Sequence, residues 1–442
     1  MLSQNILKSK NFLIYGLGLT GRSVCQFLKK SRTKNIFLWD DNRNLRKKFK
    51  IKENSRILKK KINEADFIIL SPGISLRKSK YKKTLLKNQK KIITDIDLFF
   101  LTKKFFKSII VTGTNGKSTT CSIIKRVLES SGHNIVAVGN IGKPILDYNF
   151  QRNTIAVIEM SSFQLEYSKY LRPNYAILLN ISKDHLDWHG TMKNYINAKF
   201  KIFSYQNTND FAYVFDDQRI INLYKRRKFK ASLLVVKKNI KKFIKNKIKN
   251  NYLKSSNNVE NLSFIYLLMK KFKIADKFFF SSLKKFKGLP HRQEVFLKKN
   301  KISFINDSKA TSFEASKSCL TNYKNIIWIL GGLKKDGDRF FLNRIKKNII
   351  KAFIIGKDRN FFKKQLRGKI DYKETLNLKN TVKHIYQELK FISLQKKKER
   401  IFVIFSPASA SYDQFNNFEE RGNQFKKLTI NYARKYFRKI KI

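Results

Sequence analysis

One glycine-rich segment limits what this chain can fold into more than any other part of the sequence. The segment consists of Val111, Thr112, Gly113, Thr114, Asn115, Gly116, Lys117, Ser118, Thr119 and Thr120. An apolar run precedes it, and a helical pattern of apolar residues follows it. A strand, a glycine-rich turn and a helix that opens on Lys-Ser-Thr are suited to hold a triphosphate. Backbone N–H groups line such a turn, the helix N-terminus is electropositive, the lysine neutralises phosphate and a hydroxyl can reach Mg²⁺.

The spacing within this loop is unusual. Only Thr114 and Asn115 separate Gly113 from the pair Gly116-Lys117, whereas the common phosphate loop has four residues there. In a lysine-rich chain, Gly-Lys-Ser could also arise by chance at an ordinary helix N-terminus. The strand before the loop and the helix after it favour ATP binding over that alternative.

The net charge of +65, from 96 Lys and Arg against 31 Asp and Glu, has two interpretations. A strong positive field attracts nucleic acids and anionic membranes whatever their sequence. Alternatively, the charge reflects composition alone, because Lys, Asn, Ile, Phe and Tyr are abundant together while Trp, Pro, Gly and Met are scarce. The lysines are spread over every segment, although residues 237–249 are locally dense, so we expect no nucleic-acid partner.

The cysteines and the hydropathy pattern bear on where the chain works. Cys25, Cys121 and Cys319 lie far apart, without the spacing of a disulfide framework or a metal site, which is typical of reduced thiols. No apolar run approaches the roughly 20 residues that cross a bilayer. The stretch Asn11–Leu19 is short and contains Gly16 and Gly18, so it predicts a strand and a turn, not a signal peptide. We therefore expect a monomeric, cytoplasmic protein with no membrane partner.

At 442 residues the chain is long enough for two or three domains. Short apolar runs alternate with helical patterns, which predicts parallel sheets with crossover helices. The expected strands are Phe12–Tyr15, Ile36–Trp39, Phe67–Leu70, Lys91–Thr94, Ile155–Ile158, Tyr175–Leu179, Ile302–Ile305, Ile326–Leu330, Ala352–Ile355 and Ile401–Phe405, with a terminal helix at Gln424–Phe437. Residues 237–251 are charged and poorly patterned, and we expect them at the surface. We predict three α/β domains: a Rossmann-like domain over 1–102, a central ATPase-type parallel sheet over 103–288 and a second Rossmann-like domain over 289–442.

The first expected strand leads into another phosphate-type turn. Residues 16–21, Gly-Leu-Gly-Leu-Thr-Gly, match the dinucleotide fingerprint, and Asp40 follows at the end of the second strand. NAD would explain this turn, but the diphosphate of any nucleotide fits it. A chain with an ATP loop one domain later has less need of NAD, so a UDP-linked substrate is the simpler interpretation. Residues 71–73, Ser-Pro-Gly, form a second turn that faces the same crevice, unless they only end a strand.

Acidic and basic side chains follow several strands. Glu159 ends a strand beside the phosphate loop, where Mg²⁺ needs an oxygen ligand. His185, next to Asp184 at another strand end of the same sheet, is either a hydrogen-bonding residue of the framework or, the interpretation we favour, a metal ligand. Arg292 offers a guanidinium for phosphate. Asp307 and Lys309 place an acid and a base at one strand end, which suits contact with a nucleotide.

In this order, the motifs resemble those of the Mur ligases. The resemblance rests on Gly113–Thr119, Asn140-Ile141-Gly142, Glu159–Glu166, Asp184-His185, Gly288–Glu294, Asn306–Thr311, Gly331-Gly332 and Ser406–Gly422. The opening turn and the segment Ser406–Gly422 are most similar to the family member that adds D-glutamate to UDP-N-acetylmuramoyl-L-alanine in peptidoglycan synthesis.

The resemblance implies a reaction that uses ATP and Mg²⁺. The family joins a carboxylate to an amine through an acyl phosphate and a tetrahedral intermediate, which requires charge neutralisation around the γ-phosphoryl group more than a covalent nucleophile. Lys117 would hold the β,γ-phosphates, Ser118 and Glu159 the first Mg²⁺, and His185 the second. Lys199 matches the lysine that the family carries as a carbamate, which turns a cation into an oxygen ligand. Without the resemblance, Lys199 would be one more surface lysine.

The same correspondence implies the binding residues. Besides the loop, ATP would contact Asn258, Asn261, Arg292, Asp307 and Lys309. UDP would lie against Gly18, Leu19, Thr20, Asp40, Ser71, Pro72 and Gly73, and the muramoyl group against Asn140. D-Glutamate would be held by Thr311, Lys335, Ser411, Tyr412 and Phe418, although Phe418 could instead pack in the core. The active site is expected in the cleft between the domains, and closure of the last domain would complete it.

Two departures from the family pattern stand out. Residues 257–261, Asn-Asn-Val-Glu-Asn, lack the usual His of the adenine motif, and Ser409 stands where a Cys is often found. The first puts the contact with the nucleotide base in question, and the second argues against thiol chemistry. A Mur-type ligase for another amino acid and, in a different class, a basic nucleic-acid-binding protein are the alternatives.

Overall fold

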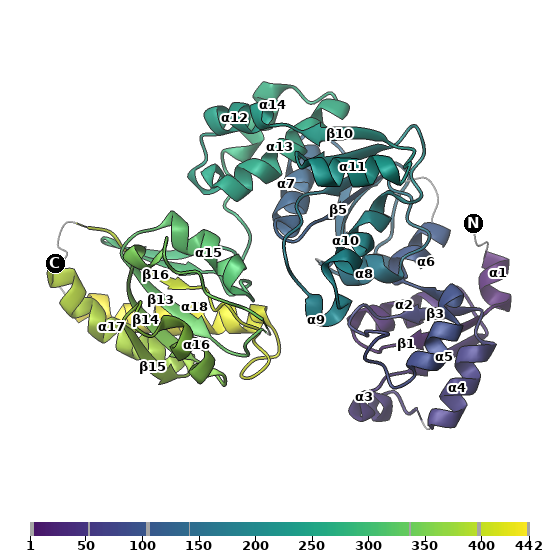
Figure 1. The fold of residues 1–442 in the computed structure, drawn as a ribbon, viewed down its shortest axis with the longest axis horizontal. Coiled ribbons are helices and arrows are strands. Elements are labelled where there is room, and N and C mark those ends of the chain that lie inside the picture. The colour runs from purple at the N-terminus through teal and green to yellow at the C-terminus, as the bar shows by residue number, and fades with distance from the viewer. Residues whose placement is uncertain are drawn as a thin grey trace. The chain divides into compact units, whose positions relative to one another are not determined.

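The computed structural model describes residues 4–51, 54–102, 107–140, 142–335, 337–395 and 399–439. Residues 103–106, where the central domain is predicted to begin, and the motif residue Ile141 lie outside these ranges. The chain forms two compact units, Met1–Lys285 and Phe286–Ile442. It contains three sheets, two in the first unit and one in the second (Figure 1). The predicted three-part α/β architecture is therefore confirmed, whereas the exact domain limits stay a prediction.

The first sheet is parallel, with strand order β2-β1-β3-β4. Its strands are β1 (Asn11–Tyr15), β2 (Asn35–Trp39), β3 (Phe67–Leu70) and β4 (Ile92–Ile93). The helices of this region are α1 (Gln4–Ser9), α2 (Leu19–Lys30), α3 (Arg43–Lys48), α4 (Ser55–Glu64), α5 (Lys82–Lys87) and α6 (Asp95–Thr102), with the 3-10 turn η1 (Gln89–Lys91). All four predicted strands of this region are present, each around a short apolar run, although β4 covers only Ile92–Ile93 and β2 is mostly half-buried.

The second sheet is also parallel and has the order β10-β9-β8-β5-β7-β6. Its strands are β5 (Lys107–Thr112), β6 (Ile135–Gly139), β7 (Ile155–Glu159), β8 (Tyr175–Leu178), β9 (Phe211–Phe215) and β10 (Ser232–Val236). Its helices are α7 (Lys117–Ser130), α8 (Ser162–Tyr167), α9 (Leu186–His189), α10 (Met192–Phe200), α11 (Gln218–Arg226), α12 (Lys238–Lys247), α13 (Ser256–Lys271) and α14 (Asp276–Leu283), with η2 (Ile145–Asp147), η3 (Lys201–Phe203) and η4 (Asn251–Lys254). The phosphate loop follows β5, and the segment that follows β8 contacts this loop through Asn180 and Ser182 before it reaches Asp184 and His185. Both segments therefore leave the sheet at the carboxyl ends of its strands.

The first two sheets belong to one unit because a single apolar core runs through both. It contains Ile14 and Phe99 from the first region together with Ile110, Ile158 and Phe200 from the second. Hydrogen bonds reinforce the junction. The Asp97 carboxylate accepts from the N–H groups of Lys169 and Tyr170 at 2.9 and 2.8 Å, and the Tyr167 hydroxyl joins Ile74 and Leu76. The two sheets are thus coupled through packing and through buried polar contacts.

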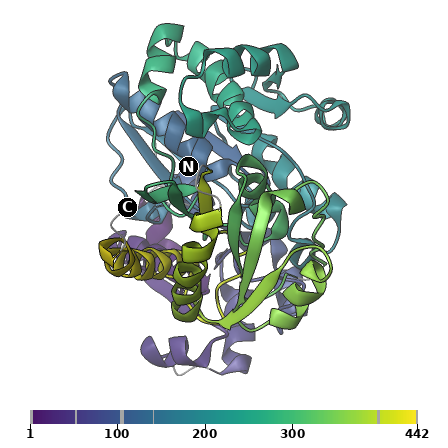
Figure 2. The ribbon, with the colours of Figure 1, turned by 90° about the vertical axis from the view of Figure 1, so that its left-hand side faces the viewer.

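The third sheet has the order β11-β12-β16-β13-β14-β15 and is parallel except for the edge strand β11. Its strands are β11 (Glu294–Lys299), β12 (Ile302–Asn306), β13 (Ile326–Gly331), β14 (Ile349–Ile355), β15 (Tyr372–Leu376) and β16 (Ile401–Phe405). Its helices are α15 (Phe313–Asn322), α16 (Arg359–Leu366), α17 (Leu378–Gln395) and α18 (Phe418–Lys439), with η5 (Lys346–Asn348). Side chains of α15 and α16 join one apolar cluster and those of α17 and α18 another, so helices cover both faces. Figure 2 shows α17 and α18 side by side.

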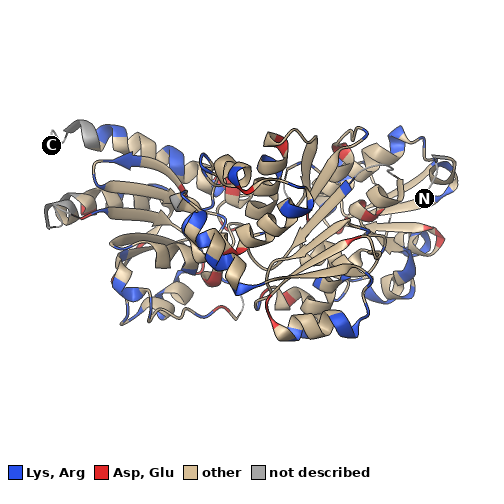
Figure 3. Cartoon of the chain, turned by 90° about the horizontal axis from the view of Figure 1, so that it is seen from above, with Lys and Arg blue, Asp and Glu red and all other residues tan. Residues whose placement is uncertain are grey.

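The positive charge is not gathered on one surface. Figure 3 shows Lys and Arg on helices and loops throughout the chain. Within the described ranges, no helix combines the length and the apolar composition that crossing a membrane requires. Residues 237–251, which showed no clear pattern in the sequence, contain helix α12, whose one buried residue is Ile244.

Candidate active site

The phosphate loop joins β5 to α7 and depends on a glycine. Gly116, the residue before α7, has φ +87°, and a Cβ atom there would come within 2.4 Å of the Asn261 side-chain oxygen. A residue with a side chain would therefore be strained and would collide with α13. The same contact places Asn261, one of the expected ATP residues, directly beside the loop. Asn258 is one turn earlier on α13, and its amide donates to the Tyr252 carbonyl at 2.8 Å.

Asn180, just after β8, fixes the shape of the loop. Its side-chain oxygen accepts from the N–H groups of Thr114 and Asn115 at 3.1 and 2.9 Å, and its amide nitrogen donates to the Asn115 carbonyl at 3.1 Å. Lys117 bonds within the loop, donating to the carbonyls of Gly113 and Thr114 at 2.9 and 2.8 Å. Ser118 and Thr119 are buried in the first turn of α7.

Lys199 is buried on α10, with 1% of its surface exposed, and its ammonium nitrogen donates to the Gly113 carbonyl at 2.8 Å. Burial lowers the pKa of Lys199 well below its ordinary value, and the positive charge of Lys117 lowers it further, while Asp184 acts in the opposite direction. A lysine whose neutral form is favoured carries a nucleophilic amine, which can react with carbon dioxide. The structure therefore places Lys199 against the phosphate loop and not at the surface.

Glu159, the last residue of β7, is also buried. Its Oε1 atom accepts from the Asn140 side chain at 3.0 Å, whereas its buried Oε2 atom accepts no hydrogen bond from a described residue. A buried carboxylate oxygen without a partner costs free energy unless a cation or a donor meets it. Glu159 therefore fits a metal ligand. Asn140, which we expected to bind the muramoyl group, therefore lies in direct contact with the expected metal ligand Glu159.

His185 lies at the N-terminus of α9 with φ +52°, an unusual conformation for a non-glycine residue. Its Nε2 atom is 3.4 Å from Asp184 Oδ2, and its ring centre is 4.7 Å from that of Phe163. Within the described part of the chain, no three His, Cys, Asp or Glu side chains are placed together to hold a metal. The predicted set instead combines Glu159 and His185 with a hydroxyl and a modified lysine.

The sequence reasoning missed two buried side chains near Lys199, Tyr195 and His189. Tyr195 lies one turn earlier on α10, its ring centre is 4.7 Å from the Lys199 nitrogen, and its hydroxyl is 2.9 Å from that of Thr114. His189 is buried, and its Nε2 atom is 2.9 Å from the Ser162 hydroxyl. Burial lowers the pKa of His189 to about 4, with help from the charges of His185 and Lys199. The four-residue spacing between Tyr195 and Lys199 was the available signal, since such pairs share a helix face.

The expected UDP residues surround one hollow at the carboxyl ends of β1, β2 and β3. Its volume is about 370 Å³, and among its lining residues are Gly18, Leu19, Thr20, Asp40, Ser71, Pro72 and Gly73. The Asp40 carboxylate accepts from the N–H groups of Leu17 and Asn42 at 2.7 and 2.8 Å, which fixes the turn at residues 16–18. Gly21 is required here, because a Cβ atom on it would lie 1.8 Å from the Gly16 carbonyl oxygen. The structure thus brings these seven residues together.

In the second unit, Asp307 follows β12 and is buried. Its carboxylate accepts from the Ser406 hydroxyl at 2.7 Å and from the Gln293 N–H group at 3.1 Å, and burial raises its pKa to about 7. The Lys309 ammonium nitrogen lies 3.7 Å from the ring centre of Phe418, which is half-buried at the start of α18. Arg292 is half-buried on the segment before β11.

The expected D-glutamate residues occupy neighbouring loops of this unit. A bridge between Leu333 and Ala410 places the loop of Lys335 beside that of Ser411 and Tyr412. Ser411 is buried, whereas Tyr412 is 73% exposed and Thr311 is also exposed. The sequence reasoning passed over Arg421 as a site residue. This buried guanidinium donates to the carbonyls of Ser308 and Ser409 at 2.8 and 3.1 Å and so ties two site loops together.

A phosphate loop on a parallel sheet, a nucleotide-type hollow on a second sheet and a buried lysine at the loop define a nucleotide-dependent α/β enzyme. Comparisons with known protein families show to which family of such enzymes the chain belongs. Residues 111–275 match the family described as Mur ligase middle domain, and residues 10–94 match the family described as Mur ligase MurD-like, N-terminal domain.

Curated relatives match along nearly the whole chain. The UDP-N-acetylmuramoylalanine–D-glutamate ligase of Wolbachia sp. subsp. Brugia malayi is 34% identical, with 95% of each chain covered, and that of Rickettsia prowazekii is 33% identical, with 96% of this chain and 99% of the relative covered. The fold resembles MurF ligase from Thermotoga maritima in complex with ADP, at a TM-score of 0.58, 14% identity and 98% coverage of both chains. The chain therefore belongs to the Mur ligase family, in its group of UDP-N-acetylmuramoylalanine–D-glutamate ligases.

Proposed function

We propose that this chain catalyses the ATP-dependent addition of D-glutamate to UDP-N-acetylmuramoyl-L-alanine in peptidoglycan precursor synthesis, with release of ADP and phosphate. The family of its full-length relatives supports this reaction. The observation that carries the proposal is the buried Lys199 on the Gly113 carbonyl, beside a phosphate loop and a buried carboxylate with an unpartnered oxygen. A phosphate loop alone serves many reactions, whereas this combination suits phosphorylation of a carboxylate.

The chemistry has two steps. An oxygen of the L-alanyl carboxylate attacks the γ-phosphorus of ATP, ADP leaves, and an acyl phosphate forms. The amine of D-glutamate, after losing a proton, attacks the acyl carbon to give a tetrahedral intermediate. The intermediate collapses as the bond from carbon to the phosphate oxygen breaks, which leaves an amide and inorganic phosphate.

In this proposal the side chains of the first unit bind and neutralise charge. Lys117 would exchange its bonds to the loop carbonyls for the β,γ-phosphates, while Thr114, Asn115 and the first turn of α7 offer N–H groups. Ser118, Glu159, His185 and the carbamate of Lys199 would hold Mg²⁺. When bound, Mg²⁺ would neutralise charge on the transferring phosphoryl group. Tyr195, which lies against the Lys199 nitrogen, and His189, which contacts Ser162, would help to position the metal-binding side chains.

The remaining roles follow the same correspondence. The hollow at Asp40 would take the uridine diphosphate, and Asn140 would contact the muramoyl part. Asn258, Asn261, Arg292, Asp307 and Lys309 would contact ATP, and Thr311, Lys335, Ser411, Tyr412 and Phe418 would hold D-glutamate. We also propose that the domains divide at residues 102 and 288, and that the protein is a cytoplasmic monomer without nucleic-acid or membrane partners. The dispersed lysines support the absence of a nucleic-acid partner, since they mark no single binding face (Figure 3).

The test is release of ADP and phosphate with Mg²⁺-ATP and UDP-N-acetylmuramoyl-L-alanine in the presence of D-glutamate, L-glutamate, D-alanine or no amino acid. Turnover only with D-glutamate is expected. Turnover with another amino acid would move the substrate assignment within the family. A folded protein that turns over none of them would overturn the proposal.

A further inference from the structure

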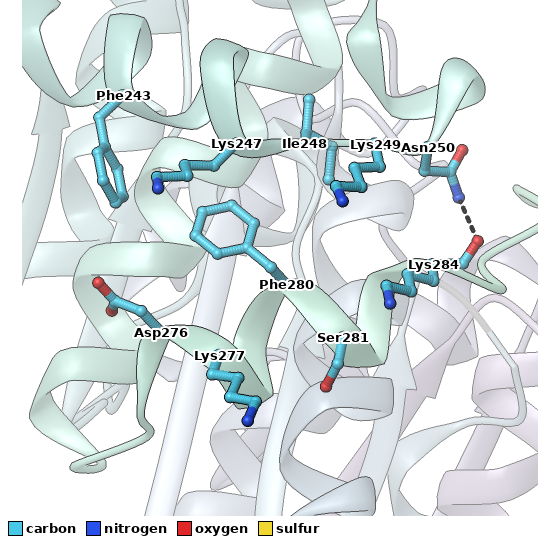
Figure 4. Close-up of a pocket in the computed structure, with 10 residues that line it drawn as sticks. All are labelled: Phe243, Lys247, Ile248, Lys249, Asn250, Asp276, Lys277, Phe280, Ser281 and Lys284. Atoms are coloured by element: carbon cyan, nitrogen blue, oxygen red, sulfur yellow. Dashed lines mark hydrogen bonds between the residues drawn. The ribbon is translucent and has the colours of Figure 1, made fainter.

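A second hollow lies outside the site described above, in the helical part of the first unit. Its volume is about 520 Å³, and it opens between the end of α12 with the residues that follow it and helix α14 (Figure 4). Its lining includes Phe243, Lys247, Lys249, Lys277, Phe280 and Lys284. None of these residues has a role in the proposed ligase reaction.

Two aromatic rings form the apolar part of this hollow. Phe243 and Phe280 meet edge to face with ring centres 5.9 Å apart, and both pack on Tyr266 of α13, at 5.3 and 6.4 Å. Both phenylalanines are only half-buried, so part of each ring borders the hollow. In Figure 4 the Phe280 ring stands in the middle of the hollow, between the two walls. A planar apolar group could pack against these rings.

The rim of the hollow is cationic. Lys247, Lys249, Lys277 and Lys284 are all exposed. Asp276 is the one acidic lining residue, and it already accepts from Lys270 at 2.5 Å and from the Tyr266 hydroxyl at 3.1 Å. The lining thus holds four lysines against one carboxylate, on which the charge of Lys247 also acts, so the excess of positive charge favours an anionic ligand.

We propose that this hollow binds a nucleoside phosphate, with the base against Phe280 and Phe243 and the phosphate among the four lysines. Aromatic faces beside cationic side chains are the usual means of holding a base and its phosphate without sequence preference. The volume lies in the range of sites for small ligands, and a concave site suits one compact ligand better than a flat membrane surface. This site is additional to the UDP hollow and the phosphate loop.

The test is lysine acetylation footprinting of the full chain by mass spectrometry, with AMP as the probe. Because each lysine is read separately, AMP bound at the phosphate loop does not obscure the result, and no turnover is needed. AMP is expected to protect Lys247, Lys249, Lys277 and Lys284 but not Lys242 and Lys245, which are exposed on the same helix α12 outside the hollow. Adenosine and tripolyphosphate, tested separately, are expected to protect these lysines less than AMP does.

A pair of variants tests the assignment further. In Lys277→Ala/Lys284→Ala, the AMP concentration that half-protects Lys247 and Lys249 should rise roughly tenfold or more. The control Lys242→Ala/Lys245→Ala should leave it unchanged. Circular dichroism melting would show that both variants fold, which is expected because the four side chains are exposed.

Three outcomes would overturn the proposal. Equal protection of the hollow and of the control lysines would show only diffuse attraction of anions. Protection by a single-stranded oligothymidylate but not by AMP would assign the surface to nucleic acid. No protection by AMP at millimolar concentration would leave the hollow without a nucleotide function, whether or not the ligase reaction is found.

Discussion

The two proposed nucleotide sites of the first unit differ in how they are prepared for their ligands. The hollow at Asp40 is an open space shaped by backbone turns, whose glycines and carboxylate already hold the phosphate-type turn in place. The phosphate loop is instead closed on itself, since Lys117, Lys199 and Asn180 all bond its own backbone groups. We expect the first site to receive its ligand without rearrangement, whereas the second would exchange internal bonds for bonds to phosphate. Under the proposed function, binding and chemistry are thus prepared by different means in one compact unit.

The largest effect is expected at the closed loop. Lys117→Ala should lower kcat by roughly three orders of magnitude, because it removes the cation that neutralises the transferring phosphoryl group. The KM for UDP-N-acetylmuramoyl-L-alanine should change little, as the open hollow is untouched. Steady-state phosphate release measures both constants. Lys125→Ala, on the same helix α7 but paired with Glu129, is the matched control and should remain active.

Lys199 allows a chemical test of the same loop. Removal of dissolved carbon dioxide should reduce activity several-fold, and bicarbonate should restore it, because the neutral amine favoured by burial forms a carbamate reversibly. Lys199→Ala should lower activity by about a hundredfold or more and abolish the bicarbonate response. If the activity of the unaltered chain did not depend on bicarbonate, the proposal that Lys199 is carbamoylated would be wrong. Lys199 would then have only a structural role.

The open hollow should respond in KM and not in kcat. Asp40→Ala removes the acceptor for the N–H groups of Leu17 and Asn42, so the turn loses its support. The KM for the UDP substrate should rise roughly tenfold while kcat stays within about twofold. Asp66→Ala is the control, since this carboxylate pairs with Lys10 just before β3, outside the hollow. A drop in kcat alone would show that the two sites are not prepared separately.

The smallest effect concerns stability. The pKa of His189 falls to about 4 in the folded chain, from an ordinary value of about 6.5. Between these values the unfolded chain binds the proton and the folded chain does not, so stability should fall as pH drops through this window. The loss between pH 7 and pH 5 should be on the order of 1–2 kcal/mol in urea unfolding. His189→Gln should reduce it, whereas the control substitution of the more exposed His384, His384→Gln, should leave it unchanged.

The sequence predicted strands that are short, continuous runs of large apolar residues. Apolar runs such as Phe67–Leu70 and Ile401–Phe405 became strands with the expected limits. The edge strands β11 and β15 were not predicted, because they mix lysines and polar residues with apolar ones and show no clear alternation. β6, β9 and β10 were overlooked although all three consist mostly of apolar residues. In α12, abundant lysines concealed the helical spacing of Ile240, Phe243 and Ile244.

Some residues of the candidate site could likewise be predicted from the sequence, and others could not. Residues in a loop with its own conformational signature, such as Gly116 and Lys117, could be found from spacing alone. The burial of Lys199 could not, because a lysine on an amphipathic helix gives no sign of which neighbours will enclose it. The contacts of Asn180 and Arg421 were equally hidden, since each acts by joining loops that lie far apart in sequence. Such positioning roles depend on tertiary contacts that no local pattern records.

The most direct measurement follows an isotope from substrate to product. UDP-N-acetylmuramoyl-L-alanine carrying heavy oxygen in its alanyl carboxylate would be turned over with ATP and D-glutamate, and the released phosphate analysed by mass spectrometry. We expect one labelled oxygen to pass to each phosphate released, because the bond from the acyl carbon to that oxygen breaks when the amide forms. Unlabelled phosphate formed along with the D-glutamate product would contradict the acyl phosphate and the role given to the closed loop.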